Sequence, residues 1–193
     1  MRTVKENIPQ AVHLIGISGS GMSSLAECLL QLGRSVSGSD LRLTEVTESL
    51  AASGVRIYRG HSRTQVIGVG LIVVSDAIPT SNVELDEARI RGIPVLRRAV
   101  CLDLICREQR AVMIAGSHGK TTTSAMIAWI LKYSGADPSF ALGATVPILG
   151  HQRAHIGRGE YFVAEACEAF CNLHNFHPSL AVITNIDNEH LNH

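Results

Sequence analysis

The chain has 193 residues and a formal net charge of zero, with 46% hydrophobic and 18% charged residues. This length suits one large domain or about one and a half ordinary ones. The balanced charge, without a basic run, argues against nucleic-acid binding and against attachment to an anionic membrane. The polar start MRTVKENIPQ does not resemble a signal peptide, and no apolar run approaches the roughly 18 residues of a spanning helix. The five cysteines form no CxxC pair, which favours free thiols in a reducing cytoplasm over disulfides or a zinc knuckle.

Short apolar runs alternate with helix-like segments through the first half of the chain. Strands are expected at 12–17, 35–40, 55–58, 70–76 and 93–96, and helices at 22–32, 44–54 and 82–92. Gly33, Gly54 and Gly92 lie where these helices should end. Apolar strands that alternate with helices predict an α/β fold, with a parallel sheet covered on both faces and right-handed crossovers. This unit should be complete near residue 108, because the segment 104–110 is polar at its end.

A second unit begins with a strand expected at 111–116. A long helix over 121–135 follows, and two further strands are expected at 161–166 and 180–186. The stretch 139–160 between them holds several glycines and indicates strand pieces and loops. The sequence therefore predicts two domains, residues 1–108 and 109–193.

The sequence GISGSG, residues 16–21, lies directly between a predicted strand and a predicted helix. The N–H groups and the dipole of a helix N-terminus attract anions, and glycines let the backbone approach a pyrophosphate closely. Ser18 departs from the usual dinucleotide fingerprint, so the loop indicates a nucleotide or nucleotide sugar rather than a clear NAD site. Asp40 ends the second strand, where such folds place a ribose-binding acid. The alternative is a tight turn without a ligand.

The sequence GSHGKTTT, residues 116–123, also connects a predicted strand to a helix. Successive N–H groups of such a loop surround phosphate oxygens, while Lys120 supplies a positive charge and the Thr121 hydroxyl suits Mg²⁺. The pattern departs from GxxxxGK[ST], because Ile114 occupies the first glycine position and Gly116 takes its place. A chance match in a turn is the alternative, and the strand–loop–helix context argues against it.

Two later strands end in polar side chains of the kind that complete a metal site. They supply Glu165, Glu168, Asn185, Asp187, Glu189 and His190. Because the carboxyl ends of parallel strands meet at one edge of a sheet, we expect Glu165 and His190 to face the phosphates. Mg²⁺ prefers oxygen ligands, so a surface position is the alternative for His190.

Together these motifs resemble those of the Mur ligase family. The matching stretches run in order from residue 13 to 191 and are HLIGISGSGMS, VSGSDL, GHS, VVSDAIP with the following Asn82, RGIPVLRRA, AGSHGKTTT, YFVAEACE and TNIDNEHL. The stretch AGSHGKTTT is shared in outline by all members of the family. The glycine loop and SGSDL are more particular to the branch that adds L-alanine and to the branch that recycles a tripeptide. The chain departs from the family at three positions. An acidic residue is common where Cys167 and Asn192 stand, and aspartate is common where Glu189 stands.

The resemblance implies a Rossmann-like first domain that binds a UDP-sugar, a P-loop central domain that binds ATP and Mg²⁺, and a third domain that binds an amino acid. ATP would phosphorylate the muramoyl carboxylate of UDP-N-acetylmuramate in peptidoglycan synthesis. The amine of L-alanine would then attack the acyl phosphate through a tetrahedral intermediate. The chain would stop inside the central domain, leaving its sheet with an unprotected edge. We therefore expect it to bind the UDP-sugar but not to complete the ligation alone.

The resemblance also implies roles for individual residues. The proposed ATP-binding residues are Gly116, Ser117, His118, Gly119, Lys120, Thr121 and Thr122. The proposed UDP-sugar-binding residues are Ser18, Gly19, Ser20, Gly21, Met22, Asp40, Ser75, Ala77 and Ile78. Thr121 and Glu165 would ligate the first Mg²⁺ and His190 a second metal, with Lys120, Glu165 and His190 as the catalytic residues. The alternatives are a tripeptide-recycling ligase, a non-catalytic UDP-sugar-binding module and, least well supported, an unrelated P-loop NTPase.

Overall fold

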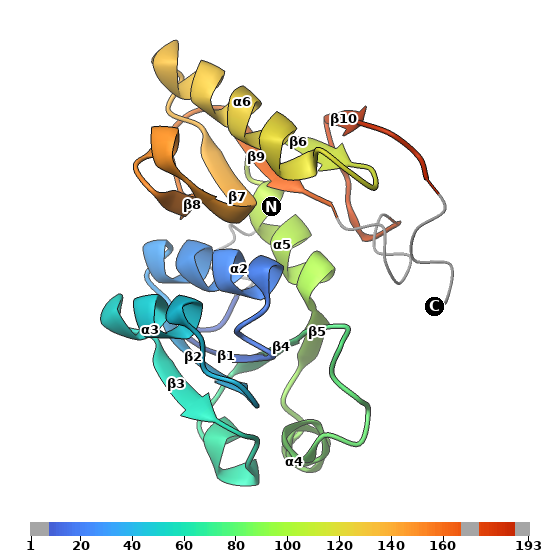
Figure 1. Cartoon of the computed structure of the whole chain (residues 1–193). Helices are drawn as coiled ribbons and strands as arrows, with labels where there is room; N and C mark the ends of the chain where they lie inside the picture. The colour runs from blue at the N-terminus through green and yellow to red at the C-terminus, as the bar shows by residue number, and fades with distance from the viewer. Residues whose placement is uncertain (1–7, 167–173, 188–193) are drawn as a thin grey trace. The chain divides into compact units, whose positions relative to one another are not determined.

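The computed structural model describes residues 8–166 and 174–187, and the chain divides into two compact units, residues 1–101 and 102–193 (Figure 1). Each unit is built on a five-stranded sheet with helices packed against it. The α/β fold expected from the alternating pattern is therefore confirmed.

The sheet of the first unit is parallel throughout, in the order β3-β2-β1-β4-β5. Its strands are β1 (Ala11–Ile15), β2 (Ser35–Asp40), β3 (Arg56–Arg59), β4 (Leu71–Val74) and β5 (Val95–Arg97). All five predicted strands are present, and the apolar residues of β1 and β4 are buried, as inner parallel strands require. The strand order reverses between β1 and β4, and open α/β sheets bind ligands beside such a reversal, at the carboxyl ends of the strands.

The three helices predicted for this unit are α2 (Ser20–Gln31), α3 (Glu45–Ala52) and α4 (Val83–Arg91). Gly33 and Gly92 follow α2 and α4 with φ of +77° and +65°, a conformation that glycine adopts without a steric penalty. A short 3₁₀ helix, η1 (Arg63–Val66), was not predicted.

Helix α5 (Arg98–Cys106) corrects the sequence prediction, which ended the first unit without a fourth helix. Ala99, Leu102 and Cys106 are buried and lie three and four residues apart, which is the helical period that was overlooked. The boundary between the two units falls within this helix, after Cys101.

The sheet of the second unit has the order β10-β6-β9-β7-β8. Its strands are β6 (Arg110–Ala115), β7 (Ser139–Val146), β8 (Gln152–His155), β9 (Tyr161–Glu165) and β10 (Leu180–Ile183). All neighbours pair in parallel except β7 and β8, which form an antiparallel hairpin around η2 (Pro147–Leu149). This hairpin occupies the stretch where strand pieces and loops were expected. Helix α6 (Lys120–Tyr133) packs over β6, β7 and β9.

Three cysteines within the described residues, Cys28, Cys101 and Cys106, are free and buried. Burial raises the pKa of the Cys28 thiol, and it raises the pKa of Cys101 to about 12, so both thiols are protonated and unreactive. No helix in the described part of the chain is long and apolar enough to cross a membrane.

Candidate functional site

The glycine loop, residues 16–21, leaves β1 beside the reversal of strand order. Gly16 has φ of +84°, and a Cβ atom at this position would lie 3.0 Å from the Cβ of Ser75 and 3.3 Å from the side chain of Ile78. The absence of a side chain thus lets the segment after β4 pack directly on the glycine loop. Ser75 and Ile78 therefore lie together with the loop, as predicted, and the Ala77 N–H donates to Ser75 Oγ at 3.4 Å.

The first turn of α2 presents free backbone donors. Gly19 is the N-cap and has no side chain to satisfy them, and the first intrahelical bond runs from the Ser23 N–H to the Gly19 carbonyl at 2.9 Å. Within the described residues no partner is found for the N–H groups of Ser20, Gly21 and Met22. Met22 can contribute only this N–H group, because its side chain is 2% exposed and lies in the core.

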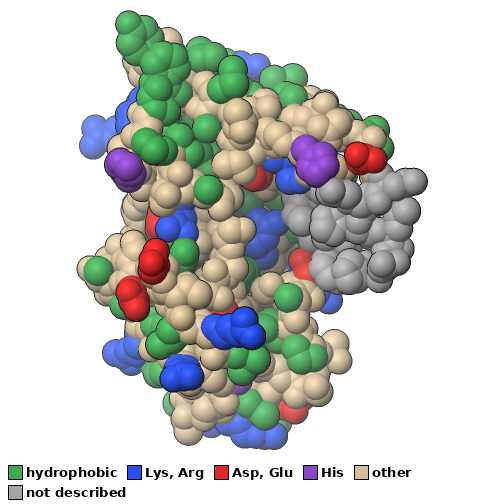
Figure 2. All heavy atoms as spheres, in the orientation of Figure 1, with side chains coloured by type: hydrophobic (Ala, Val, Ile, Leu, Met, Phe, Trp, Pro, Cys, Tyr) green, Lys and Arg blue, Asp and Glu red, His purple; other side chains and the backbone are tan. Residues whose placement is uncertain are grey.

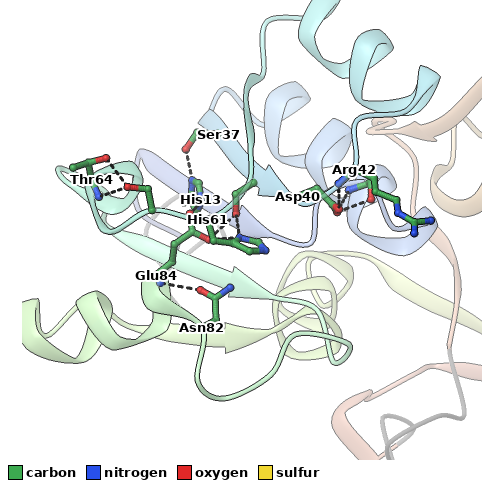
Figure 3. A network of polar contacts seen from close by, with 11 residues as sticks. His13, Ser37, Asp40, Arg42, His61, Thr64, Asn82 and Glu84 are labelled. Carbon is green, nitrogen blue, oxygen red and sulfur yellow. Dashed lines mark hydrogen bonds and ion pairs between the residues drawn. The ribbon is translucent and has the colours of Figure 1, made fainter.

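Asp40, at the end of β2, contacts the glycine loop directly. Its Oδ2 atom accepts hydrogen bonds from the N–H group and from the hydroxyl of Ser18, and its Oδ1 atom accepts one from the Arg42 N–H at 3.2 Å (Figure 3). The serine that departs from the dinucleotide fingerprint is therefore the residue that ties the loop to β2. A contact between Asp40 and a nucleoside stays a prediction.

A buried polar network lies next to this edge of the sheet. Glu84, in the first turn of α4, accepts a hydrogen bond from the Ser39 hydroxyl at 2.7 Å and lies 2.8 Å from His61 Nδ1 (Figure 3). Its other oxygen faces His13 Nε2 at 3.3 Å, and neither Glu84 nor His13 is exposed. Burial raises the pKa of the Glu84 carboxyl, but the close approach of His13 and the hydrogen bonds with Ser39 and His61 outweigh this effect and leave the pKa below its usual value.

Ser39 connects this network to the glycine loop. Its carbonyl accepts the N–H groups of Gly16 and Ile17 at 2.9 and 3.2 Å. Local patterns could not have revealed the network, because His13 and Glu84 are far apart in the sequence. The signal in the sequence was His13, a polar residue inside the otherwise apolar strand β1.

The second loop, residues 116–119, leaves β6 and leads into α6. Gly116 and Gly119 have φ of +125° and +81°. Gly119 is the N-cap, and the first intrahelical bond runs from Thr123 N–H to its carbonyl at 2.9 Å. Lys120 Nζ donates to the carbonyls of Gly116 and of Ser117, the latter at 3.1 Å. The structure thus brings the predicted lysine against its own loop.

Thr121 and Glu165 meet at the carboxyl edge of this sheet. The Thr121 hydroxyl donates to Glu165 Oε2 at 3.0 Å, and Glu165 Oε1 accepts the Gly143 N–H at 2.7 Å. A Cβ atom on Gly143 would lie 3.0 Å from Glu165 Oε2 and 3.3 Å from Thr121 Oγ1, so this glycine keeps the space beside both oxygens open. Two oxygen donors with open space beside them fit Mg²⁺.

The other predicted metal ligands do not complete a cluster within the described chain. His190, Glu189 and Glu168 lie outside the described residues, as do Cys167 and Asn192. In residues 8–166 and 174–187 no group of three or more His, Cys, Asp or Glu side chains is placed to hold a metal ion.

Asn185, a candidate metal ligand in the sequence, instead holds the second loop. Its Oδ1 atom accepts the N–H group of His118 at 2.9 Å, and its Nδ2 group donates to the carbonyl of the same residue at 3.0 Å. The Thr184 hydroxyl donates to that carbonyl at 2.6 Å, and the Asp187 N–H donates to Ser117 Oγ at 3.2 Å. The segment after β10 therefore positions the second loop, a role that sequence reasoning missed.

Comparison with known proteins agrees with this arrangement. The model of the "Mur ligase family, catalytic domain" matches residues 11–110, and that of the "Mur ligase middle domain" matches residues 114–193. The UDP-N-acetylmuramate–L-alanine ligase of Solibacter usitatus is 43% identical over 185 residues, which are 96% of this chain and 39% of that ligase. The ligase of the same name from Bordetella pertussis is 45% identical over 182 residues, 94% of this chain and 39% of its own length. The chain thus spans about two fifths of these relatives.

Two solved structures show the same fold. The UDP-N-acetylmuramate–alanine ligase of Thermotoga maritima superposes with a TM-score of 0.87 at 32% identity, over 94% of this chain and 43% of that one. A UDP-N-acetylmuramate:L-alanyl-γ-D-glutamyl-meso-diaminopimelate ligase from Neisseria superposes with a TM-score of 0.84 at 28% identity, over 93% of this chain and 61% of that one.

Proposed function

Because this chain belongs to the Mur ligase family, we propose that it forms the UDP-sugar-binding domain and the first part of the ATP-binding domain of a UDP-N-acetylmuramate–L-alanine ligase. The observation that carries the proposal is a pair of loops, one on each sheet, that each lead from a strand into a helix with a glycine N-cap. The alanine-ligase name of relatives at 43–47% identity supports the choice of amine substrate.

The first loop would bind UDP-N-acetylmuramate. The N–H groups of Ser20, Gly21 and Met22 would donate to its diphosphate, since these donors have no partner among the described residues. Asp40 and Ser18 would hold the loop in shape, with Ser75, Ala77 and Ile78 at its side.

The second loop would bind ATP. Lys120 would exchange its contacts with the loop carbonyls for phosphate oxygens, and the first N–H groups of α6 would donate to the phosphates. Thr121 and Glu165 would hold Mg²⁺, with His190 as a further ligand. When bound, the ion would neutralise negative charge on the phosphates.

The chemistry explains why this chain has such a loop. A carboxylate is a poor electrophile, so an oxygen of the muramoyl carboxylate attacks the γ-phosphorus and releases ADP. The amine of L-alanine then attacks the acyl carbon, and phosphate leaves. The first attack joins two anionic groups, and Lys120 would counter their repulsion and align them. Both nucleotides are metabolites of the cytoplasm, which we propose as the location of the protein.

A tripeptide-recycling ligase is the second candidate, because the Neisseria structure superposes nearly as well as the alanine ligase. Both enzymes act on the same sugar nucleotide by their names, so the two candidates share both loops. A non-catalytic UDP-sugar-binding module is the third, and it would leave Lys120 without a function.

Isothermal titration of the purified chain with UDP-N-acetylmuramate, and separately with ATP and Mg²⁺, tests the proposal. We expect saturable binding of each ligand to its own site. With both ligands and L-alanine present, we expect little phosphate release, because the chain spans about two fifths of its relatives. Absence of UDP-N-acetylmuramate binding would refute the proposed first site, and rapid alanine-dependent phosphate release would refute the need for further domains.

A further inference from the structure

We propose that Arg98 binds the diphosphate of the nucleotide sugar and is the cationic partner of the glycine loop. This inference rests on the proposed function of that loop. Arg98 belongs to the stretch RGIPVLRRA, but no role followed from that motif, because Arg98 lies 77 residues after Gly21 in the sequence, at the start of α5.

The guanidinium of Arg98 lies directly against the first turn of α2. A Cβ atom on Gly21 would lie 3.0 Å from Arg98 Nη1 and 3.1 Å from its Cζ and Cδ atoms. Gly21 does not have a positive φ, so the backbone there accepts any residue, and glycine weakens a helix. Space for the guanidinium explains why a glycine stands at this helical position.

The side chain of Arg98 is available for a ligand in the described part of the chain. Its neighbour Arg97 forms an ion pair with Asp76 at 2.6 Å, whereas no hydrogen bond or ion pair is found for the half-buried Arg98 within residues 8–166 and 174–187. Arg98 is also the first residue of α5, and a cation at a helix N-terminus opposes the helix dipole. Neither folding nor pairing accounts for a charge in this place.

The charge balance of the loop requires such a cation. Residues 16–22 carry no charged side chain, and the carboxylate in contact with them is Asp40. A diphosphate adds further negative charge. The guanidinium supplies paired N–H donors that match phosphate oxygens, and it lies beside the free N–H groups of α2.

Titrations with uridine, UDP and UDP-N-acetylmuramate test this inference on the intact chain. Arg98→Ala should weaken both diphosphate ligands by about tenfold to a hundredfold and leave uridine unchanged, because only the charged contact is lost. Arg98→Lys should recover part of the affinity. Arg91→Ala removes an exposed arginine that pairs with Glu87 and serves as the charge-matched control. The salt dependence of UDP binding should become shallower in Arg98→Ala only.

The outcomes separate the two proposals. Unchanged UDP affinity in folded Arg98→Ala would overturn this inference and leave the proposed function standing. A loss confined to UDP-N-acetylmuramate would show that Arg98 binds the sugar's carboxylate, and would also overturn it. If Arg98→Ala does not fold, Arg98→Lys is used instead. An equal loss of affinity for uridine and for UDP in Arg98→Lys would then contradict the inference. No binding of UDP-N-acetylmuramate by the unaltered chain would overturn the proposed function itself.

Discussion

The two loops proposed to bind phosphates have the same construction on two different sheets. Each leaves a strand with a partner on both sides, each has a glycine N-cap, and in each the first intrahelical bond measures 2.9 Å. A carboxylate from the end of a neighbouring strand contacts each loop or its helix, Asp40 at Ser18 and Glu165 at Thr121. These common features, a strand that leads through a glycine into a helix N-terminus, are those of a main-chain anion site.

The differences between the loops concern the cation and the anchor. Lys120 belongs to the second loop itself, whereas the first loop has an arginine from a distant helix beside it. The first loop is anchored through Ser39 to a buried network, and the second through Asn185 after β10. The phosphate-loop motif identifies Lys120 directly. The position of Arg98 beside the first loop is seen only in the folded chain.

Both sheets bury their inner strands and expose their edges. Strand β10 is paired only with β6 in the described chain, and its Leu180 and Ile183 are 57% and 62% exposed, while Val95 of the edge strand β5 is 39% exposed. That further strands are needed to cover the second sheet stays a prediction. The outer face of α6 exposes Met126, Ile130 and Tyr133, and Figure 2 shows hydrophobic side chains over that helix at the top of the view.

The largest effect is expected from a substitution in the buried network that anchors the first loop. Glu84→Gln removes the buried charge that faces two histidines and should cost the first unit about 3 kcal/mol. Because the folded pKa of Glu84 is lowered, its contribution is present above the ordinary carboxyl pKa of about 4.3 and is lost as the pH falls through the folded value. The variant should therefore lose this part of the acid dependence.

Hydrogen exchange of β1 and β6 amides at pH 7 and pH 4 measures the two units separately. Glu87→Gln, on the same helix with exposed arginine partners, is the control and should destabilise the first unit much less than Glu84→Gln, because solvent screens exposed ion pairs. Equal losses in β1 and β6 would contradict an anchor confined to the first unit.

The second prediction tests whether the two loops bind their ligands independently, by removal of the cation of the second loop. Lys120→Ala should weaken ATP binding by about tenfold to a hundredfold, the range for one lost charged hydrogen bond. The affinity for UDP-N-acetylmuramate should not change. Lys132→Ala, at the exposed end of the same helix, is the control. A parallel loss of both ligands in calorimetric titrations would show that the sites are not independent.

The smallest effect concerns the anchor of the second loop. Asn185→Ala removes both hydrogen bonds to His118 and should weaken ATP binding about tenfold, since a loosened loop must be ordered by its ligand. The His118 amide should exchange faster with solvent even without nucleotide. Asn185→Asp keeps the acceptor and should protect that amide better than alanine does. Unaltered exchange in Asn185→Ala would rule out the anchoring role.

The sequence was sufficient for the elements that follow a local period. Strand β1, the glycine loop and α2 are adjacent, so their alternation and the position of Gly33 predict them. Helix α5 has the same kind of period, in Ala99, Leu102 and Cys106, but the polar residues after it indicate a boundary between units and obscure the helix.

Contacts between distant residues could not be predicted in this way. Thr121 with Glu165 was expected because parallel strands end at a common edge. Asn185 was placed at the same edge, but its hydrogen bonds to the His118 backbone depend on the conformation of the loop. Arg98 and Gly21 meet only because α5 begins where β5 ends.

The glycine caps have a genetic consequence. In the proposed sites the anion is bound by main-chain N–H groups of both helices, and a main-chain donor is not altered when a codon changes the side chain. Ser20, for example, can be exchanged for many residues without the loss of its N–H group. Proline is the exception, because its nitrogen has no hydrogen. A mutation that reaches these donors must therefore introduce proline or displace the backbone.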